Sequence, residues 1–93
     1  MECVIYVRHG VDTSIYEQWN VCARYAARYG YSIKHKVWDI RGDRFQEAID
    51  KALFDDNVES VIVYNNRCIG DFETSLFYKI YLGKFGKNLI SCA

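Results

Sequence analysis

Short apolar runs alternate with helical patterns along the whole chain, and this alternation limits the folds open to it more than any other feature. The strand-like runs cover residues 3–8, 31–38, 58–64 and 88–92. Between them, apolar residues recur at helical spacing in three groups: Ile15, Trp19, Cys22 and Ala26; Phe45, Ile49 and Ala52; and Phe72, Leu76 and Ile80. Strands that alternate with helices form parallel sheets through right-handed crossovers. We predict one three-layer α/β domain with a four-stranded parallel sheet.

The strand patterns also predict positions in the sheet. Val61, Ile62 and Val63 are apolar on both faces, as in a buried central strand. Residues 31–38 carry charged side chains on one face, which is typical of an edge strand. If the first and third strands are neighbours, with the second outside the first, the connection reverses between them. That reversal creates a crevice for ligands at the carboxyl ends of the strands.

The balanced charge and the hydropathy of the chain argue against nucleic-acid and membrane partners. Hydrophobic residues make up 51% of the 93 residues, enough for one compact core. Lys+Arg and Asp+Glu each total 12, so no overall charge attracts nucleic acid or a membrane surface. The chain has neither a signal-peptide pattern nor the ~18 consecutive apolar residues of a membrane span. We therefore expect a cytoplasmic protein with no membrane partner.

The four cysteines lie far apart in the sequence and form no Cys-x-x-Cys pair. Close ligand pairs are typical of zinc sites, and secreted disulfide scaffolds are denser in cysteine. Cys3, Cys22 and Cys92 lie in apolar stretches and are interpreted as small core residues. We expect neither a metal nor another cofactor.

Two loops leave the carboxyl ends of the first and third strands and, in the predicted sheet, converge. Arg8 ends the first strand and Arg67 lies in the second loop. Two guanidinium groups facing one crevice would suit a phosphate or carboxylate, so both are candidate anion-binding residues. The alternative is that each arginine only caps its loop or pairs with Asp12, Asp39 or Asp71.

A short motif at the end of the first predicted strand points to a different kind of phosphate chemistry. The chain reads Val7-Arg8-His9-Gly10, which resembles the Arg-His-Gly motif of histidine phosphatases. That resemblance implies that His9 is a nucleophile and Arg8 a phosphate clamp. The sequence departs from the family because Thr13 lies one position too far from the glycine. The other histidine, His35, lies in the middle of the second predicted strand.

A longer set of motifs runs through nearly the whole chain in a fixed order. They are Tyr6-Val-Arg8-His-Gly10, then Gln18, Cys22 and Tyr25-Ala26, then Gly30-Tyr31-Ser-Ile33, Asn66-Arg67-Cys-Ile-Gly70 and Gly86-Lys-Asn-Leu89-Ile-Ser91. Together they resemble the N-terminal catalytic domain of the serine recombinases, the resolvase and invertase family. In that family a serine hydroxyl attacks a DNA phosphodiester while arginines neutralise the developing charge. The resemblance implies a resolvase-like α/β fold.

The resemblance also implies which site residues are kept and which are lost. Arg8, Gln18 and Arg67 match positions of the family's active site. The departures are Gly10 for the nucleophilic serine, Asn66 for an aspartate and Gly70 for a second arginine. Glycine has no nucleophilic group, so covalent catalysis by this route fails. Loss of an arginine weakens charge stabilisation further.

Nearby residues offer only partial replacements. Thr13 and Ser14 are displaced from position 10, and Ser14 is better explained as a helix N-cap. Arg41 or Arg44 is an ambiguous match to a further arginine of the family. Cys68 adjoins Arg67, which favours a reactive thiolate, but a small residue turned into the core is the preferred interpretation.

These observations predict a degenerate serine-recombinase-like protein that is catalytically inactive. We expect it to act in DNA recombination or within a mobile element by binding a protein or an anion, through a recombinase partner or self-association. Residues 1–93 lack the family's long dimerisation helix and DNA-binding module, so specific DNA binding is not expected. The alternative is a histidine-phosphatase-like protein, or another phosphoesterase, using His9 with Arg8 and Arg67.

Aromatic residues gather in two of the predicted helices. They are Tyr25, Tyr29, Phe77, Tyr78 and Tyr81. We expect them to cover helix faces, whereas an exposed cluster of them would mark a partner surface.

Overall fold

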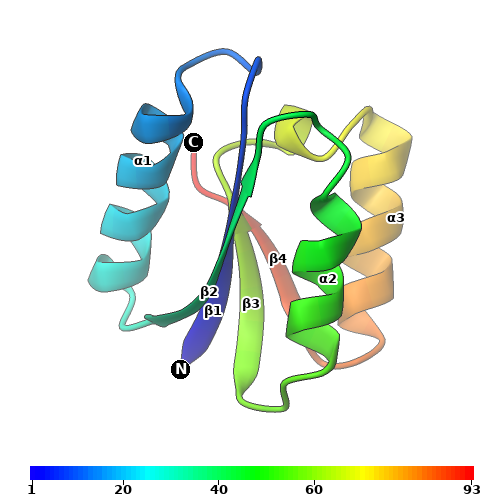
Figure 1. The fold of residues 1–93 in the computed structure, drawn as a ribbon. Coiled ribbons are helices and arrows are strands. Elements are labelled where there is room, and N and C mark those ends of the chain that lie inside the picture. The colour runs from blue at the N-terminus through cyan, green and yellow to red at the C-terminus, as the bar shows by residue number, and fades with distance from the viewer.

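Four parallel strands form one sheet with helices on both faces (Figure 1), which confirms the predicted fold class. The computed structural model describes residues 1–93. The strands are β1 (Glu2–Arg8), β2 (Ser32–Asp39), β3 (Val58–Val63) and β4 (Asn88–Ser91). The helices are α1 (Ile15–Arg28), α2 (Phe45–Leu53) and α3 (Phe72–Gly83), and a 3₁₀ turn, η1 (Asn66–Cys68), follows β3.

The strand order is β2-β1-β3-β4. The second strand therefore lies at an edge, outside the first, and the first and third strands are neighbours, as predicted. The chain crosses from β1 outward to β2 and then returns to β3 on the other side of β1. This reversal opens the carboxyl ends of β1 and β3 between diverging loops, the place where α/β sheets bind ligands.

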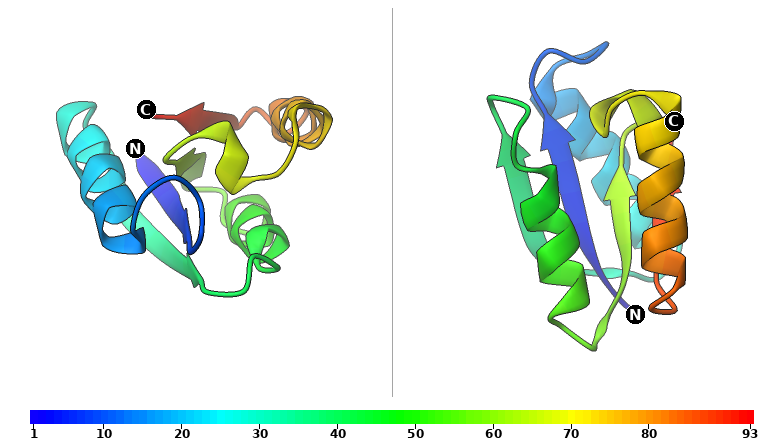
Figure 2. Two further views of the ribbon diagram at one scale, coloured as in Figure 1. Left: turned by 90° about the horizontal axis from the view of Figure 1, so that it is seen from above. Right: turned by 90° about the vertical axis from the view of Figure 1, so that its right-hand side faces the viewer.

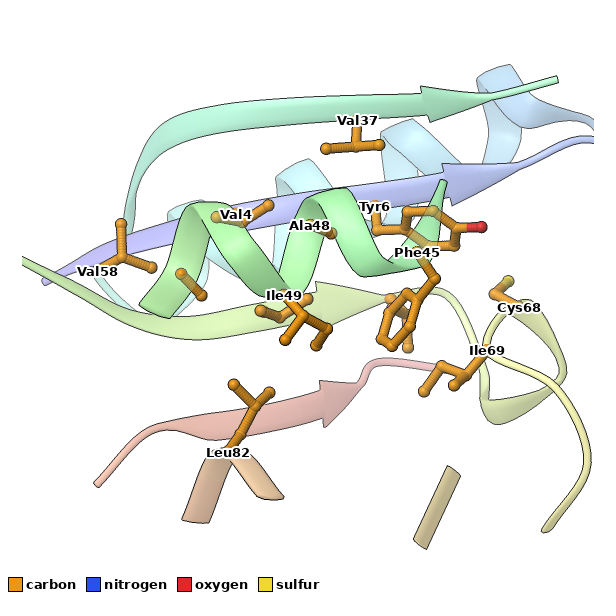
Figure 3. Packing of buried hydrophobic residues seen from close by; sticks show 13 residues of the cluster. Val4, Tyr6, Val37, Phe45, Ala48, Ile49, Val58, Cys68, Ile69 and Leu82 are labelled. Atoms are coloured by element: carbon orange, nitrogen blue, oxygen red, sulfur yellow. The ribbon is translucent and has the colours of Figure 1, made fainter. Parts of the chain in front are cut away.

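The core has two layers, one on each face of the sheet. Helix α1 covers one face, and α2 and α3 cover the other (Figure 2, left). Side chains of β1 alternate between them, because Cys3, Ile5 and Val7 pack toward α1 while Val4 and Tyr6 pack toward α2 (Figure 3). The Tyr6 ring meets the Phe45 ring edge-on, with centroids 5.0 Å apart. β1 is thus buried on both faces, which fixes the position of Arg8 at its end.

Helix α3 forms where the sequence predicts a helix, but the residues that marked it in the sequence face solvent. Phe72, Leu76 and Ile80 are 77%, 45% and 55% exposed. The buried residues of α3 are Ser75 and Leu82. The reason is that α3 lies beside the short edge strand β4 and packs against the core through Leu82 and the half-buried Tyr78 and Tyr81.

The cysteines are all free thiols. Cys3 and Cys22 are buried as predicted, whereas Cys92 is half-buried, with its sulfur 3.5 Å from that of Cys22. None of the helices is both long enough and apolar enough to cross a bilayer.

Candidate functional site

The loop after β1 and the loop after β3 meet at the carboxyl edge of the sheet. Asn65 Nδ2 donates a hydrogen bond to Asp12 Oδ2 at 2.6 Å, which links the two loops. Arg67 Nη2 lies 2.6 Å from the same carboxylate oxygen. The Arg67 side chain is 72% exposed, so this ion pair contributes only about 0–1 kcal/mol to stability. Of the alternatives that the sequence left open for Arg67, pairing with Asp12 is the one the structure contains.

Arg8 points in a different direction from Arg67. Its guanidinium lies over Gly42 in the loop between β2 and α2, so close that a Cβ atom on Gly42 would fall 2.5 Å from Arg8 Nη2. Arg67, by contrast, lines a surface hollow with Asp12, Asn65 and other residues that do not include Arg8. The two arginines share one edge of the sheet but have separate contacts. Joint anion binding would require Arg67 to leave Asp12.

The contact between Arg8 and Gly42 leads to a prediction about two matched glycines. Gly10 and Gly42 have left-handed φ angles of +83° and +84°, but only Gly42 would place a Cβ against another atom. We expect Gly10→Ala and Gly42→Ala each to lower the free energy of unfolding by about 1 kcal/mol through backbone strain. The Arg8 guanidinium is the flexible end of a side chain, so the new methyl group displaces it at little extra cost.

NMR of the Arg8 side chain distinguishes the two glycine variants. Gly42→Ala shifts the Nε–Hε resonance of Arg8, and Gly10→Ala leaves it unchanged. An unchanged resonance in both variants would show that Arg8 does not rest on Gly42 in solution.

Gln18 lies beneath the β1–α1 loop rather than in a hollow. It is fully buried, and its Oε1 accepts a hydrogen bond from the backbone N–H of Arg8 at 2.9 Å. Its Nε2 donates to the carbonyls of Arg8, Val11 and Thr13 at 2.7, 3.2 and 3.2 Å. Gln18 therefore acts on the site as a positioning residue, because it fixes the backbone between Arg8 and the start of α1.

The loop itself is open to solvent. Residues 9–14 line a shallow hollow of about 300 Å³. No atom lies within 4 Å of where a Cβ on Gly10 would be, so a side chain there would project into open space. The hydroxyl of Ser14 accepts a hydrogen bond from the Glu17 N–H at 3.1 Å, which confirms its predicted role as N-cap.

His9 and His35 lie in different parts of the sheet. His9 is exposed in the β1–α1 loop, and its backbone N–H donates to the Asp39 carbonyl at 3.0 Å. The His35 ring on β2 lies 3.4 Å from the carboxylate of Asp55, a residue that precedes β3 and so lies toward the opposite edge of the sheet. The structure does not bring a second histidine to His9.

Of the two arginines before α2, Arg44 is not free to replace a missing one as it stands. Arg44 Nε donates to Glu47 at 2.7 Å, and its Nη1 donates to the Trp38 carbonyl at 2.8 Å. Both contacts hold its guanidinium along the first turn of α2. Asn66 and Arg41 are exposed.

A buried tyrosine–aspartate pair beneath Arg8 was not singled out from the sequence. Asp39 is fully buried and accepts a hydrogen bond from the Tyr6 hydroxyl. It also accepts from the backbone N–H groups of Gly42, Asp43 and Arg44 at 2.6, 3.2 and 2.8 Å. Burial alone would raise the pKa of this carboxyl, but the four hydrogen bonds outweigh it and lower the pKa. An aspartate that ends a strand just before a glycine-containing loop was the available clue.

Cys68 is buried under the same loops, as the preferred interpretation predicted. Its sulfur lies 3.6 Å from Gln18 Oε1. Burial raises the pKa of the thiol, so the group is protonated near neutral pH and is a poor nucleophile.

No family profile matches this sequence, and no curated protein matches it. Solved structures do match, and their fold is that of the serine recombinase catalytic domain. The C-terminal catalytic domain of ISC1926 TnpA, an IS607-like serine recombinase, is 20% identical, with a TM-score of 0.78 over 100% of this chain and 70% of that one. The N-terminal catalytic domain of TP901-1 integrase is 22% identical, with a TM-score of 0.79 over 99% and 77%.

A resolvase family site-specific recombinase from Streptococcus pneumoniae is 18% identical, with a TM-score of 0.82 over 99% of this chain and 72% of that one. The fold expected from the sequence motifs is therefore confirmed over the whole chain. At these identities the similarity establishes architecture, and the activity of the chain has to be argued from its own residues.

Proposed function

We propose that this chain is a serine-recombinase-like domain that does not cleave DNA and acts by binding a protein or an anion in a DNA recombination or mobile-element setting. The observation that supports this most is Gly10. It occupies the turn after β1 with φ +83° and offers no hydroxyl for attack on a phosphodiester. The recombinase fold supports the setting, and the missing hydroxyl supports the non-cleaving role.

Neighbouring nucleophiles are committed to structural contacts. The hydroxyl of Ser14 caps α1 through the Glu17 N–H. Cys68 is fully buried, with a raised thiol pKa. These contacts argue against either residue replacing the serine without rebuilding the loop.

The anion-binding part of the proposal rests on Arg8 and Arg67. Both lie at the carboxyl edge of the sheet, and the exposed pair of Arg67 with Asp12 is weak enough for an anion to displace. Inorganic phosphate is a suitable probe, since a guanidinium fork matches its geometry. We expect phosphate to shift the Nε–Hε NMR resonances of both arginines, and Arg67→Gln to weaken binding more than the matched surface change Arg28→Gln. Equal effects would contradict a site at Arg67.

DNA cleavage is the decisive test of the non-cleaving role. The chain is incubated in excess with supercoiled plasmid and short duplexes, and covalent adducts are sought on denaturing gels. We expect neither nicked plasmid nor adduct, and the same result for Gly10→Ser, because Asn66 and Gly70 still lack the carboxylate and the guanidinium. An adduct formed by the natural sequence would overturn the proposal.

A phosphatase assay tests the alternative function. His9 is exposed beside Arg8, which is the feature that favours it. Turnover of p-nitrophenyl phosphate that is lost in His9→Ala and kept in His35→Ala would establish this alternative.

A further inference from the structure

Helix α3 presents a large apolar surface to solvent, and nothing in the chain covers it. Leu76, Phe77 and Ile80 are 45%, 59% and 55% exposed at its middle. Phe72 and Phe85 extend the surface at the two ends, where they are 77% and 56% exposed. The helix lies on the outside of the molecule, in front of the sheet (Figure 2, right). Contiguous apolar patches of this kind on small domains mark interaction surfaces.

Two opposite charges lie on the same outward face. At ~100° per residue, Glu73, Phe77, Ile80 and Lys84 project from the side of α3 opposite the buried Ser75 and Leu82. Glu73 is in the first turn and Lys84 follows the last. Both are exposed, and the ion pairs of the chain involve neither of them.

We propose that α3 is a self-association surface on which a second copy of this chain packs its own α3 antiparallel about a two-fold axis. In such an isologous contact each residue faces a fixed counterpart. The axis that sets Glu73 opposite Lys84 also sets Phe77 opposite Ile80. One symmetry operation therefore matches both the charges and the apolar residues.

The shape of the surface fits the same arrangement. Phe77, Ile80, Tyr81 and Lys84 line a hollow of about 140 Å³ on this face. The rings of Phe77 and Tyr81 stack with an interplanar angle of 9°, which gives the hollow a firm wall. The Phe77 side chain of a second copy has the size and the position to enter it. Antiparallel helices also bring opposite ends of their dipoles together.

The balance of charge favours a second copy over a membrane surface. An interfacial membrane helix carries lysines and arginines along its polar face, whereas this face pairs one acid with one base. The proposal does not depend on what the β1–α1 loop does, because α3 is separate from that loop. A single-helix contact is small, so we expect a weak dimer that dissociates on dilution.

Charge exchange tests both the surface and its geometry. Glu73→Lys and Lys84→Glu each place like charges opposite one another, and we expect each variant alone to dimerise about tenfold more weakly in sedimentation velocity. An equimolar mixture of the two variants has two attractive pairs and regains the affinity of the natural chain as a heterodimer. Glu17→Lys, at the equivalent turn of α1, is the matched control and dimerises normally.

The same measurements contain the results that would overturn the proposal. They are a natural chain that stays monomeric up to ~1 mM, well above the range expected for a weak contact, or a mixture no tighter than its components. Binding to anionic vesicles that is lost in Phe77→Ser, without any dimer, would identify a membrane surface instead. All substituted side chains are exposed, and circular dichroism checks that each variant is folded.

Discussion

We expect Asp39→Ala to lower the free energy of unfolding by about 4 kcal/mol, a large part of the stability of a domain this size. The change leaves the buried Tyr6 hydroxyl without its acceptor and frees three backbone N–H groups of the β2–α2 loop. Urea unfolding followed by tyrosine and tryptophan fluorescence measures the loss. The same variant frees the loop on which Arg8 rests.

Two milder variants calibrate this effect. Tyr6→Phe removes one donor and keeps the carboxylate on the three amide groups, so we expect a loss of about 1–2 kcal/mol. Asp39→Asn keeps the shape of the side chain but not its charge, and we expect its loss in free energy of unfolding to lie between those of Tyr6→Phe and Asp39→Ala. A cost for Asp39→Ala no greater than that for Tyr6→Phe would show that the loop amides do not depend on the carboxylate.

The lowered pKa of Asp39 predicts how this contribution varies with pH. Because the folded pKa lies below the ordinary value, the stabilisation is complete above about pH 4 and is lost as the pH falls through the folded pKa. The stability difference between the natural chain and Asp39→Asn should therefore shrink in acid. A constant difference down to about pH 2 would contradict the shift.

The fold could be predicted from the sequence because its determinants are local. Val61, Ile62 and Val63 mark a strand buried on both faces, and Ser14 marks the start of a helix through its own hydroxyl. The sheet order follows from the edge character of β2 and the handedness of crossovers.

The exposed face of α3 could not be predicted in the same way. Phe72, Leu76 and Ile80 have helical spacing, which indicates that a helix forms but not which side of it meets the sheet. The side is decided by Leu82, Tyr78 and Tyr81, which pack against the core cluster next to the short strand β4, residues 88–91. An amphipathic pattern therefore does not show which face of a helix is buried when its apolar residues face solvent or a partner instead of the core.

The site was harder to predict because its contacts join distant segments. Tyr6 and Asp39 lie on neighbouring strands, and the place of Asp39 before a glycine-containing loop does not indicate that Tyr6 is its partner. The different directions of Arg8 and Arg67 depend on Gly42 and Asp12, residues of two other loops. The sequence placed both arginines at the correct edge and offered Asp12 as one of three candidate partners, but it did not indicate the contact of Arg8 with Gly42.

Gln18→Ala is the second variant with a large expected effect, about 3 kcal/mol lost from the free energy of unfolding. Although the sequence motifs associate Gln18 with an active site, its side chain forms hydrogen bonds with partly buried backbone groups and with the Cys68 thiol. Alanine leaves the Arg8 N–H and three carbonyls without these partners. Gln46→Ala, on the exposed side of α2, is the matched control and should cost less than about 1 kcal/mol.

Hydrogen exchange shows where the loss in Gln18→Ala arises. We expect the amide of Arg8 to lose protection in this variant, while amides in the middle of β1 change only with global stability. Equal costs for Gln18→Ala and Gln46→Ala, with Arg8 still protected, would mean that the loop holds its shape without the glutamine. If the expected result is found, the buried Gln18 side chain orders the β1–α1 loop, although Gly10 in that loop has no reactive group. A loop kept rigid without a nucleophile is better suited to presenting Arg8 and its own backbone to a binding partner than to breaking a bond.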